Sequence, residues 1–175
     1  MITKQTTIRD TIQVEGRGLH TGSMVTLSFH PAEADTGYVF KRTDIDGQPE
    51  IPALANYVIS TDRGTTIGKN DAVVNTVEHV LAALVGLGID NCLMEIDGPE
   101  TPIMDGSSRF FVEALEKAGT RELDAERNYF EIKEPLRLEL PEEGVELMAV
   151  PADEYQLSVM VDYGTKVLGS QNATL

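Results

Sequence analysis

The stretch 75–96, NTVEHVLAALVGLGIDNCLMEI, joins a helix pattern directly to a strand pattern. Its apolar residues recur at i, i+3, i+4 and i+7, on one face of a helix: Val77, Val80, Leu81 and Leu84. We therefore expect a helix over 75–84 with Asn75 as its N-cap, ended by the glycines at 86 and 88. The segment 91–96 then predicts a strand.

Strand patterns surround this helix on both sides. Upstream, extended segments are predicted over 1–15, 24–29, 38–40, 51–59, 65–67 and 73–74. A second helix is predicted over 107–118, and strands return at 129–140, 145–150 and 155–163. Short turns join most of these strands, which favours antiparallel pairing. The predicted fold class is α+β, a mostly antiparallel sheet layered with helices.

The charged segment 120–128 is the best candidate for a domain boundary. It separates a first domain, 1–125, from a strand segment, 129–175, that has no helix to cover it. So few residues of strand are too small for a core of their own. We therefore expect a truncated second domain, and the chain is interpreted as a fragment. Alternatively, these strands bury a face against another copy of the chain.

Composition limits the possible partners and compartments. The 175 residues carry a net charge of −15, from 29 acidic and 14 basic side chains, and this field repels nucleic acid. No apolar run approaches the roughly 20 residues of a transmembrane helix, and the N-terminus has no apolar signal region. A cytoplasmic location is expected. The single cysteine, Cys92, lies in a predicted strand and is expected to be buried and inert.

Glu78 and His79 are the first candidates for chemistry. A neutral imidazole can ligate zinc, and a neighbouring carboxylate can take a proton from metal-activated water. A structural explanation competes, because the spacing of Asn75 and Glu78 also fits a capping box, and His79 could be a hydrogen-bonded histidine at a helix end. One Glu-His pair is not a metal motif.

Two further residues lie in glycine-containing loops. His20 lies between Gly18 and Gly22, where a hairpin connection is the alternative to a functional loop. Asp105 precedes the second predicted helix, where an N-cap or an Asx-turn is the alternative.

Taken together, four segments resemble the UDP-3-O-acyl-N-acetylglucosamine deacetylases, the zinc enzymes of lipid A biosynthesis. They are Gly18–Gly22 (GLHTG), Thr65–Gly68 (TTxG), Thr76–Leu84 (TVEHxLxAL), and Gly88–Asn91 (GIDN) continuing to Pro102–Ser107 (PIMDGS). The resemblance covers 1–125 and, more loosely, the strands that follow. It implies two similar α+β domains with the active site between them, of which 129–175 would be the start of the second.

The resemblance also implies roles for individual residues. Glu78 would be the general base and His79 one ligand of Zn²⁺, in hydrolysis of the N-acetyl group of UDP-3-O-acyl-N-acetylglucosamine with release of acetate. His20 and Asp105 would support the site. The residues near the substrate or the acyl-chain entrance would be Leu19, Arg63, Gly64 and Thr65.

The chain departs from the family pattern in one large respect. The resemblance implies two more zinc ligands, a His and an Asp spaced i, i+4 on a helix, and a further catalytic His, all from the second domain. No histidine follows His79 in this sequence. We therefore expect this polypeptide alone to be inactive, with the longer gene product as the enzyme. Some family members are fused to a dehydratase at the C-terminus. The alternative is a non-catalytic α+β module, either a binding domain or a degenerate relative.

Overall fold

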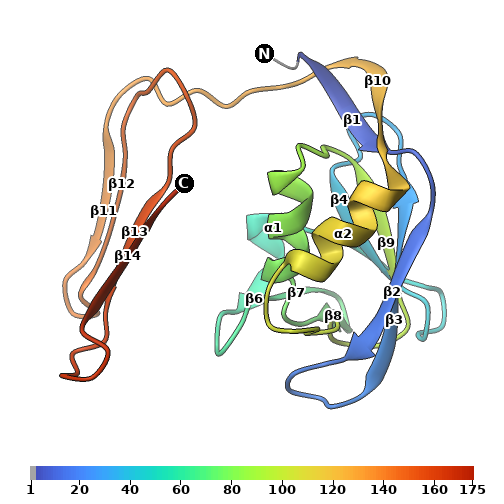
Figure 1. The fold of residues 1–175 in the computed structure, drawn as a ribbon, viewed down its shortest axis with the longest axis horizontal. Helices are drawn as coiled ribbons and strands as arrows, with labels where there is room; N and C mark the ends of the chain where they lie inside the picture. Colours follow the sequence, from blue (N-terminus) through green and yellow to red (C-terminus); the bar gives the residue numbers. More distant parts are fainter. Residues whose placement is uncertain (1–2) are drawn as a thin grey trace. The chain divides into compact units, whose positions relative to one another are not determined.

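The stretch 75–96 forms a helix, α1 (Glu78–Gly86), followed by a strand, β9 (Cys92–Ile96), in the computed structural model, which describes residues 3–175 (Figure 1). The chain divides into two compact units, Met1–Arg127 and Asn128–Leu175. Strands dominate both units and most pair antiparallel, which confirms the α+β class. No helix among residues 3–175 is long and apolar enough to cross a membrane.

The prediction that Asn75 caps the first helix was wrong. α1 begins at Glu78, and its N-cap is Val77, which makes no side-chain capping bond. The Asn75 side chain instead accepts a hydrogen bond from the Thr66 hydroxyl at 2.8 Å and donates one to the Pro99 carbonyl at 2.8 Å. Between them, Thr76 has a left-handed φ of 59°, which no continuing helix tolerates.

The main sheet of the first unit has five strands in the order β2-β3-β9-β4-β5. Their bounds are β2 (Ile12–Arg17), β3 (Met24–Pro31), β4 (Tyr38–Arg42), β5 (Glu50–Pro52) and β9. Within this sheet β4 and β9 pair in parallel, and the other neighbouring strands pair antiparallel. The strands β3 and β9 alternate between buried and half-buried side chains over most of their length, as expected when one face meets the core.

Both helices contribute to the core of this unit, and Figure 1 shows them on the same side of the sheet. The second helix, α2 (Arg109–Ala118), begins two residues later than predicted. Phe111 is fully buried, and its ring meets Phe29 of β3 edge-on with centroids 6.5 Å apart. Its neighbour Phe110 is 37% exposed.

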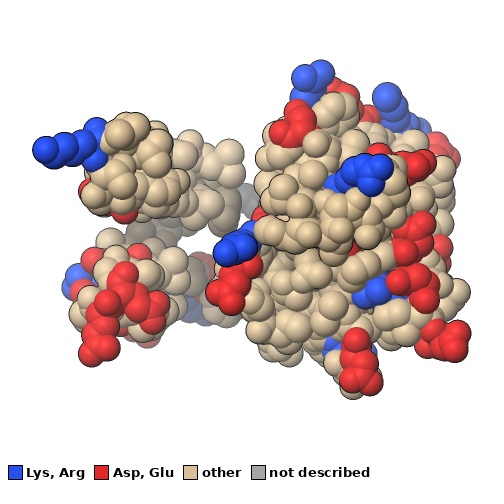
Figure 2. All heavy atoms as spheres, turned by 90° about the horizontal axis from the view of Figure 1, so that it is seen from below, with Lys and Arg blue, Asp and Glu red and all other residues tan. Residues whose placement is uncertain are grey.

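Two smaller sheets complete the first unit. One has the order β6-β7-β8, from β6 (Val58–Ser60), β7 (Thr66–Lys69) and β8 (Ala72–Val74), with a short 3₁₀ turn, Ala55–Tyr57, before it. The other pairs β1 (Lys4–Ile8) with β10 (Thr120–Glu126). The charged segment expected at a domain boundary is therefore largely a strand of the first unit, whose Leu123 is buried while most of its charges are exposed. Figure 2 shows basic side chains among the acidic ones on the visible face of this unit.

The second unit consists of two antiparallel hairpins. One pairs β11 (Leu136–Leu140) with β12 (Val145–Ala149), and the other pairs β13 (Ser158–Asp162) with β14 (Ser170–Thr174). The strand predicted over 129–140 is thus formed only in its last part. Almost every residue of these strands is exposed, apolar ones included.

Candidate active site

Glu78 is the first residue of α1, and its carboxylate is held from outside the helix. Its Oε2 accepts a hydrogen bond from the backbone N–H of Thr65 at 3.0 Å. A capping box would require Glu78 to bond back to the amide of Asn75, but that amide donates to the Pro99 carbonyl at 2.9 Å. The capping-box interpretation was therefore wrong.

The segment 63–65 lies directly against this carboxylate. A Cβ atom on Gly64 would lie 3.2 Å from Oε1 of Glu78, and Gly64 has a φ of +154° that side chains rarely adopt. Arg63 also has a left-handed φ, of 59°. The Thr65 amide therefore holds Oε2, and the neighbouring Gly64 has no side chain to crowd Oε1.

His79 follows Glu78 on α1 and is half-buried. Across residues 3–175 its imidazole makes no hydrogen bond or ion pair, so the alternative of a hydrogen-bonded histidine at a helix end is not what the structure contains. A neutral imidazole with free nitrogens can bind a transition metal.

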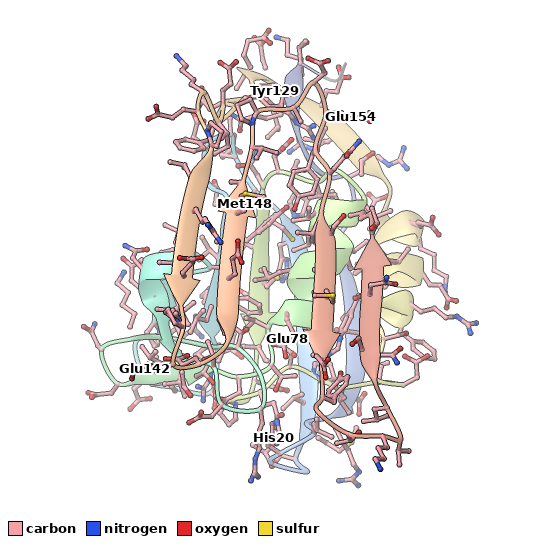
Figure 3. All side chains as sticks on the ribbon, turned by 90° about the vertical axis from the view of Figure 1, so that its left-hand side faces the viewer. His20, Glu78, Tyr129, Glu142, Met148 and Glu154 are labelled. Atoms are coloured by element: carbon pink, nitrogen blue, oxygen red, sulfur yellow. The ribbon has the colours of Figure 1, made fainter. Side chains whose placement is uncertain are left out.

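The GLHTG loop, residues 18–22, reaches the same segment. The His20 Nε2 lies 3.2 Å from the Arg63 carbonyl oxygen, to which it donates when that nitrogen is protonated. Leu19 beside it is 57% exposed. Figure 3 labels His20, in this loop, and Glu78, at the start of α1. The structure therefore links His20 to Arg63, and Thr65 in turn to Glu78.

Glu100 is a buried residue that the sequence analysis missed. Its side chain is fully buried, and its carboxylate accepts hydrogen bonds from the backbone N–H groups of His20 (3.0 and 3.1 Å) and Thr21 (2.8 Å) and from the Thr76 hydroxyl (3.0 Å). Burial by itself raises the pKa of Glu100, but these hydrogen bonds outweigh it and lower the pKa below its ordinary value of 4.5. The only signal in the sequence is a lone acid between Pro99 and Thr101.

The Asp105 carboxylate is bound within its own loop. Its Oδ1 accepts hydrogen bonds from the Ser107 backbone N–H (3.0 Å) and hydroxyl (2.7 Å), which is the Asx-turn considered as its alternative. The Ser107 hydroxyl and then its amide lower the pKa of Asp105. Asp105 lines a surface hollow of about 450 Å³ together with Arg17, Met104 and Phe110.

Among residues 3–175, no three His, Cys, Asp or Glu side chains gather into a group that could hold a metal ion. The imidazole of His79 has the donor chemistry of a zinc ligand, and it could supply one of the three protein ligands usual in a catalytic site. The start of α1 thus carries the Glu78 carboxylate, with one oxygen held by a hydrogen bond, next to the His79 imidazole, which has no hydrogen-bond partner among the described residues.

Comparison with known proteins identifies the family of the chain. The family model of LpxC, UDP-3-O-acyl N-acetylglycosamine deacetylase, matches residues 5–175. The chain is 50% identical over 175 residues to the bifunctional enzyme LpxC/FabZ of Chlorobaculum tepidum, covering all of this chain and 38% of that protein. It is also similar to two proteins named UDP-3-O-acyl-N-acetylglucosamine deacetylase. The one from Idiomarina loihiensis is 40% identical over 98% of this chain and 56% of its own length. The one from Geobacter sp. is 41% identical over 98% of this chain and 55% of its own length.

The chain thus spans between 38% and 56% of the lengths of these relatives. The match runs through both units and includes the segments of Glu78, His79, His20 and Glu100. This chain belongs to the UDP-3-O-acyl N-acetylglycosamine deacetylase family.

Proposed function

We propose that this chain supplies the Glu78–His79 part of a zinc-dependent deacetylase that hydrolyses the N-acetyl group of UDP-3-O-acyl-N-acetylglucosamine in lipid A biosynthesis. The observation that carries the proposal is the pairing of a constrained carboxylate with an unpartnered imidazole at the start of α1, in a chain of this family. The proposal includes the cytoplasmic location expected from the sequence.

Glu78 acts as the general base in this proposal. Water attacks the acetamide carbon while Oε1 of Glu78 takes a proton from it, and Thr65 holds the other oxygen in place. The C–N bond then breaks, the proton passes to the leaving nitrogen, and acetate and the free amine are released. Gly64 keeps the approach to Oε1 open because it carries no side chain.

His79 would hold the zinc ion. When bound, zinc supplies Lewis-acid polarisation of the amide carbonyl and a lowered pKa of water. Further ligands are proposed to come from a second domain, of which Asn128–Leu175 would be the opening strands. We propose that Leu19, Arg63 and Thr65 lie near the substrate. Thr65 binds the Glu78 carboxylate, and Leu19 belongs to the GLHTG loop, whose His20 contacts Arg63.

The test uses the gene product that contains this chain. Glu78→Gln keeps the size of the side chain but removes the base, so we expect kcat for deacetylation to fall about 10²- to 10⁴-fold with zinc content unchanged. His79→Ala should lose the zinc, measured by metal analysis after dialysis. Glu116→Gln, an exposed change on α2, is the matched control and should match wild type. Undiminished activity of Glu78→Gln would contradict the assigned role.

A non-catalytic α+β module is the second candidate. It is motivated by the lack of a three-ligand cluster among residues 3–175. It predicts that the gene product binds no catalytic zinc and leaves the acetamide intact. We also propose a dehydratase domain fused at the C-terminus, which the bifunctional name of the Chlorobaculum relative supports. The length of the gene product would test this.

A further inference from the structure

Glu100 is a fully buried carboxylate that takes no part in the proposed chemistry. Burying a charge is costly unless its hydrogen bonds are satisfied. Among the described residues, no Lys, Arg or His side chain forms an ion pair with Glu100, so polar N–H and O–H donors alone stabilise it. A charge kept at this cost calls for an explanation beyond packing.

The donors to Glu100 come from two segments far apart in the sequence. Its carboxylate binds the backbone amides of His20 and Thr21 in the GLHTG loop and the hydroxyl of Thr76 just before α1. A carboxylate suits this position because it is acceptor-only and can serve several donors with two oxygens. Glu100 therefore ties the loop to the start of the helix that carries Glu78.

These contacts close a ring around the candidate base. From Glu100 the path runs through the His20 backbone to its imidazole, then to the Arg63 carbonyl. Two residues further, the Thr65 amide binds the Glu78 carboxylate, and Thr76 leads back to Glu100. Each link is a hydrogen bond or a short covalent step.

Thr76 is a second, independent sign that this ring is specified by tertiary structure. It is a β-branched residue with a φ of 59°, a conformation that costs free energy and persists only where the surroundings hold it. The Glu100 carboxylate accepts from its hydroxyl, and the Thr101 hydroxyl donates to its carbonyl at 2.6 Å. Gly18 leaves the necessary space, since a Cβ atom there would lie 2.4 Å from Glu100 Oε2.

We infer that Glu100 is a positioning residue for the deacetylation site, holding the GLHTG loop and the start of α1 in the arrangement that aims the Glu78 carboxylate. This inference rests on the proposed function for its catalytic consequence. The loop contacts themselves can be tested without any catalysis.

The first test uses the 175-residue chain and measures amide hydrogen exchange. In Glu100→Ala, the amides of His20 and Thr21 lose their acceptor, and we expect their exchange to speed up by about tenfold or more. Amides of the central strand β9 should keep wild-type protection. Glu116→Gln again serves as the control, because its side chain is exposed on α2.

The second test measures kinetics in the gene product. We expect Glu100→Ala to lower kcat about 10²-fold, as a misplaced catalytic group does, with KM within about twofold and zinc content unchanged. Glu100→Gln should restore most of kcat. Its amide oxygen can still accept from Thr21, and its NH₂ can donate to Thr76, whose hydroxyl rotates to accept.

The outcomes separate the two proposals. A wild-type gene product without deacetylase activity would overturn the proposed function. Unchanged exchange at His20 and Thr21 in Glu100→Ala, or an unchanged kcat, would overturn the positioning role alone. Equal loss of protection in β9 would reduce Glu100 to a general structural residue and overturn it as well.

Discussion

Replacing Gly18 by alanine tests how tightly the GLHTG loop fits against the buried acid. The φ of Gly18 is not in the left-handed region, so alanine strains no torsion there. Its new methyl group would instead lie 2.4 Å from both Glu100 Oε2 and Thr21 Oγ1, and 2.9 Å from Glu100 Cδ. Contacts below 3.0 Å force a neighbour to move. Thr21 is exposed and can turn away, whereas Glu100 is buried and cannot.

The expected cost follows from these contacts. Overpacking a buried position costs about 1–3 kcal/mol. Hydrogen bonds to a charged acceptor are worth about 1.5–3 kcal/mol, and the displaced carboxylate weakens at least one of them. We expect Gly18→Ala to lower the free energy of unfolding of the first unit by about 2–4 kcal/mol. With a urea dependence of about 2 kcal/mol/M, the midpoint falls by about 1–2 M.

Cys92 provides an assay specific to the first unit. It is the only cysteine in the chain, it lies in β9, and its side chain is fully buried. Thiol labelling at increasing urea therefore reports opening of the main sheet and is silent about the second unit. The labelled fraction at each urea concentration gives the midpoint for wild type and each variant.

Gly22→Ala is the matched control in the same loop. Gly22 has a φ of +66° and nothing within 4 Å of its added Cβ, so alanine there costs only backbone strain, about 1–2 kcal/mol. In a Glu100→Ala background, the cost of Gly18→Ala should shrink by at least about 1 kcal/mol, while that of Gly22→Ala stays constant. Equal costs of Gly18→Ala in both backgrounds would refute the reasoning.

Three further outcomes are expected. Burial raises the pKa of Cys92 to about 12 from an ordinary 9.0, so the native thiolate fraction near pH 8 should be about 10³-fold below that of the unfolded chain; thiolate absorbance followed against pH would show this, and coinciding titration curves for the native and unfolded chain would contradict it. The pKa of Glu100 is lower in the folded state than its ordinary 4.5, so its stabilising contribution should be complete above that value and disappear as pH falls through the folded pKa. The urea midpoints of wild type and Glu100→Gln should therefore approach each other as the pH becomes acidic. A difference between the two midpoints that grows at acidic pH would contradict the lowered pKa. Phe111→Ala should cost about 3–5 kcal/mol, whereas Phe110→Ala on the exposed side should cost less than about 1 kcal/mol; similar midpoint shifts would contradict the burial difference.

Local periodicity was enough to predict the elements that bury a regular stripe. The apolar spacing around Val80 and Leu84 predicted the body of α1, and the run ending at Ile96 predicted β9. The α+β class followed from the order of such elements and is confirmed. These features depend on a repeat of 3.6 or 2 residues, which is visible in a single segment.

The same reasoning failed where a distant partner decides the structure. Asn75 has the side chain of an N-cap, but Thr66 and Pro99 use its amide. The charged segment 120–128 was predicted only as a domain boundary, and the units do divide after Arg127, but most of the segment forms β10, which pairs with β1 more than a hundred residues earlier. An exposed strand edge tolerates charge as readily as a linker does, so composition alone could not separate them.

For the candidate site, too, the sequence predicted some residues and the tertiary structure was needed for the others. The sequence by itself determined the family resemblance and, through it, the candidates Glu78 and His79, whose roles stay predictions. Only the tertiary structure decided that Glu100 is buried and that His20, Arg63 and Thr65 lie on a path to Glu78. The physical reason is that spacing along the chain encodes the face of one element, whereas the hydrogen bonds of a buried acid depend on donors that folding brings from about 80 and 24 residues away.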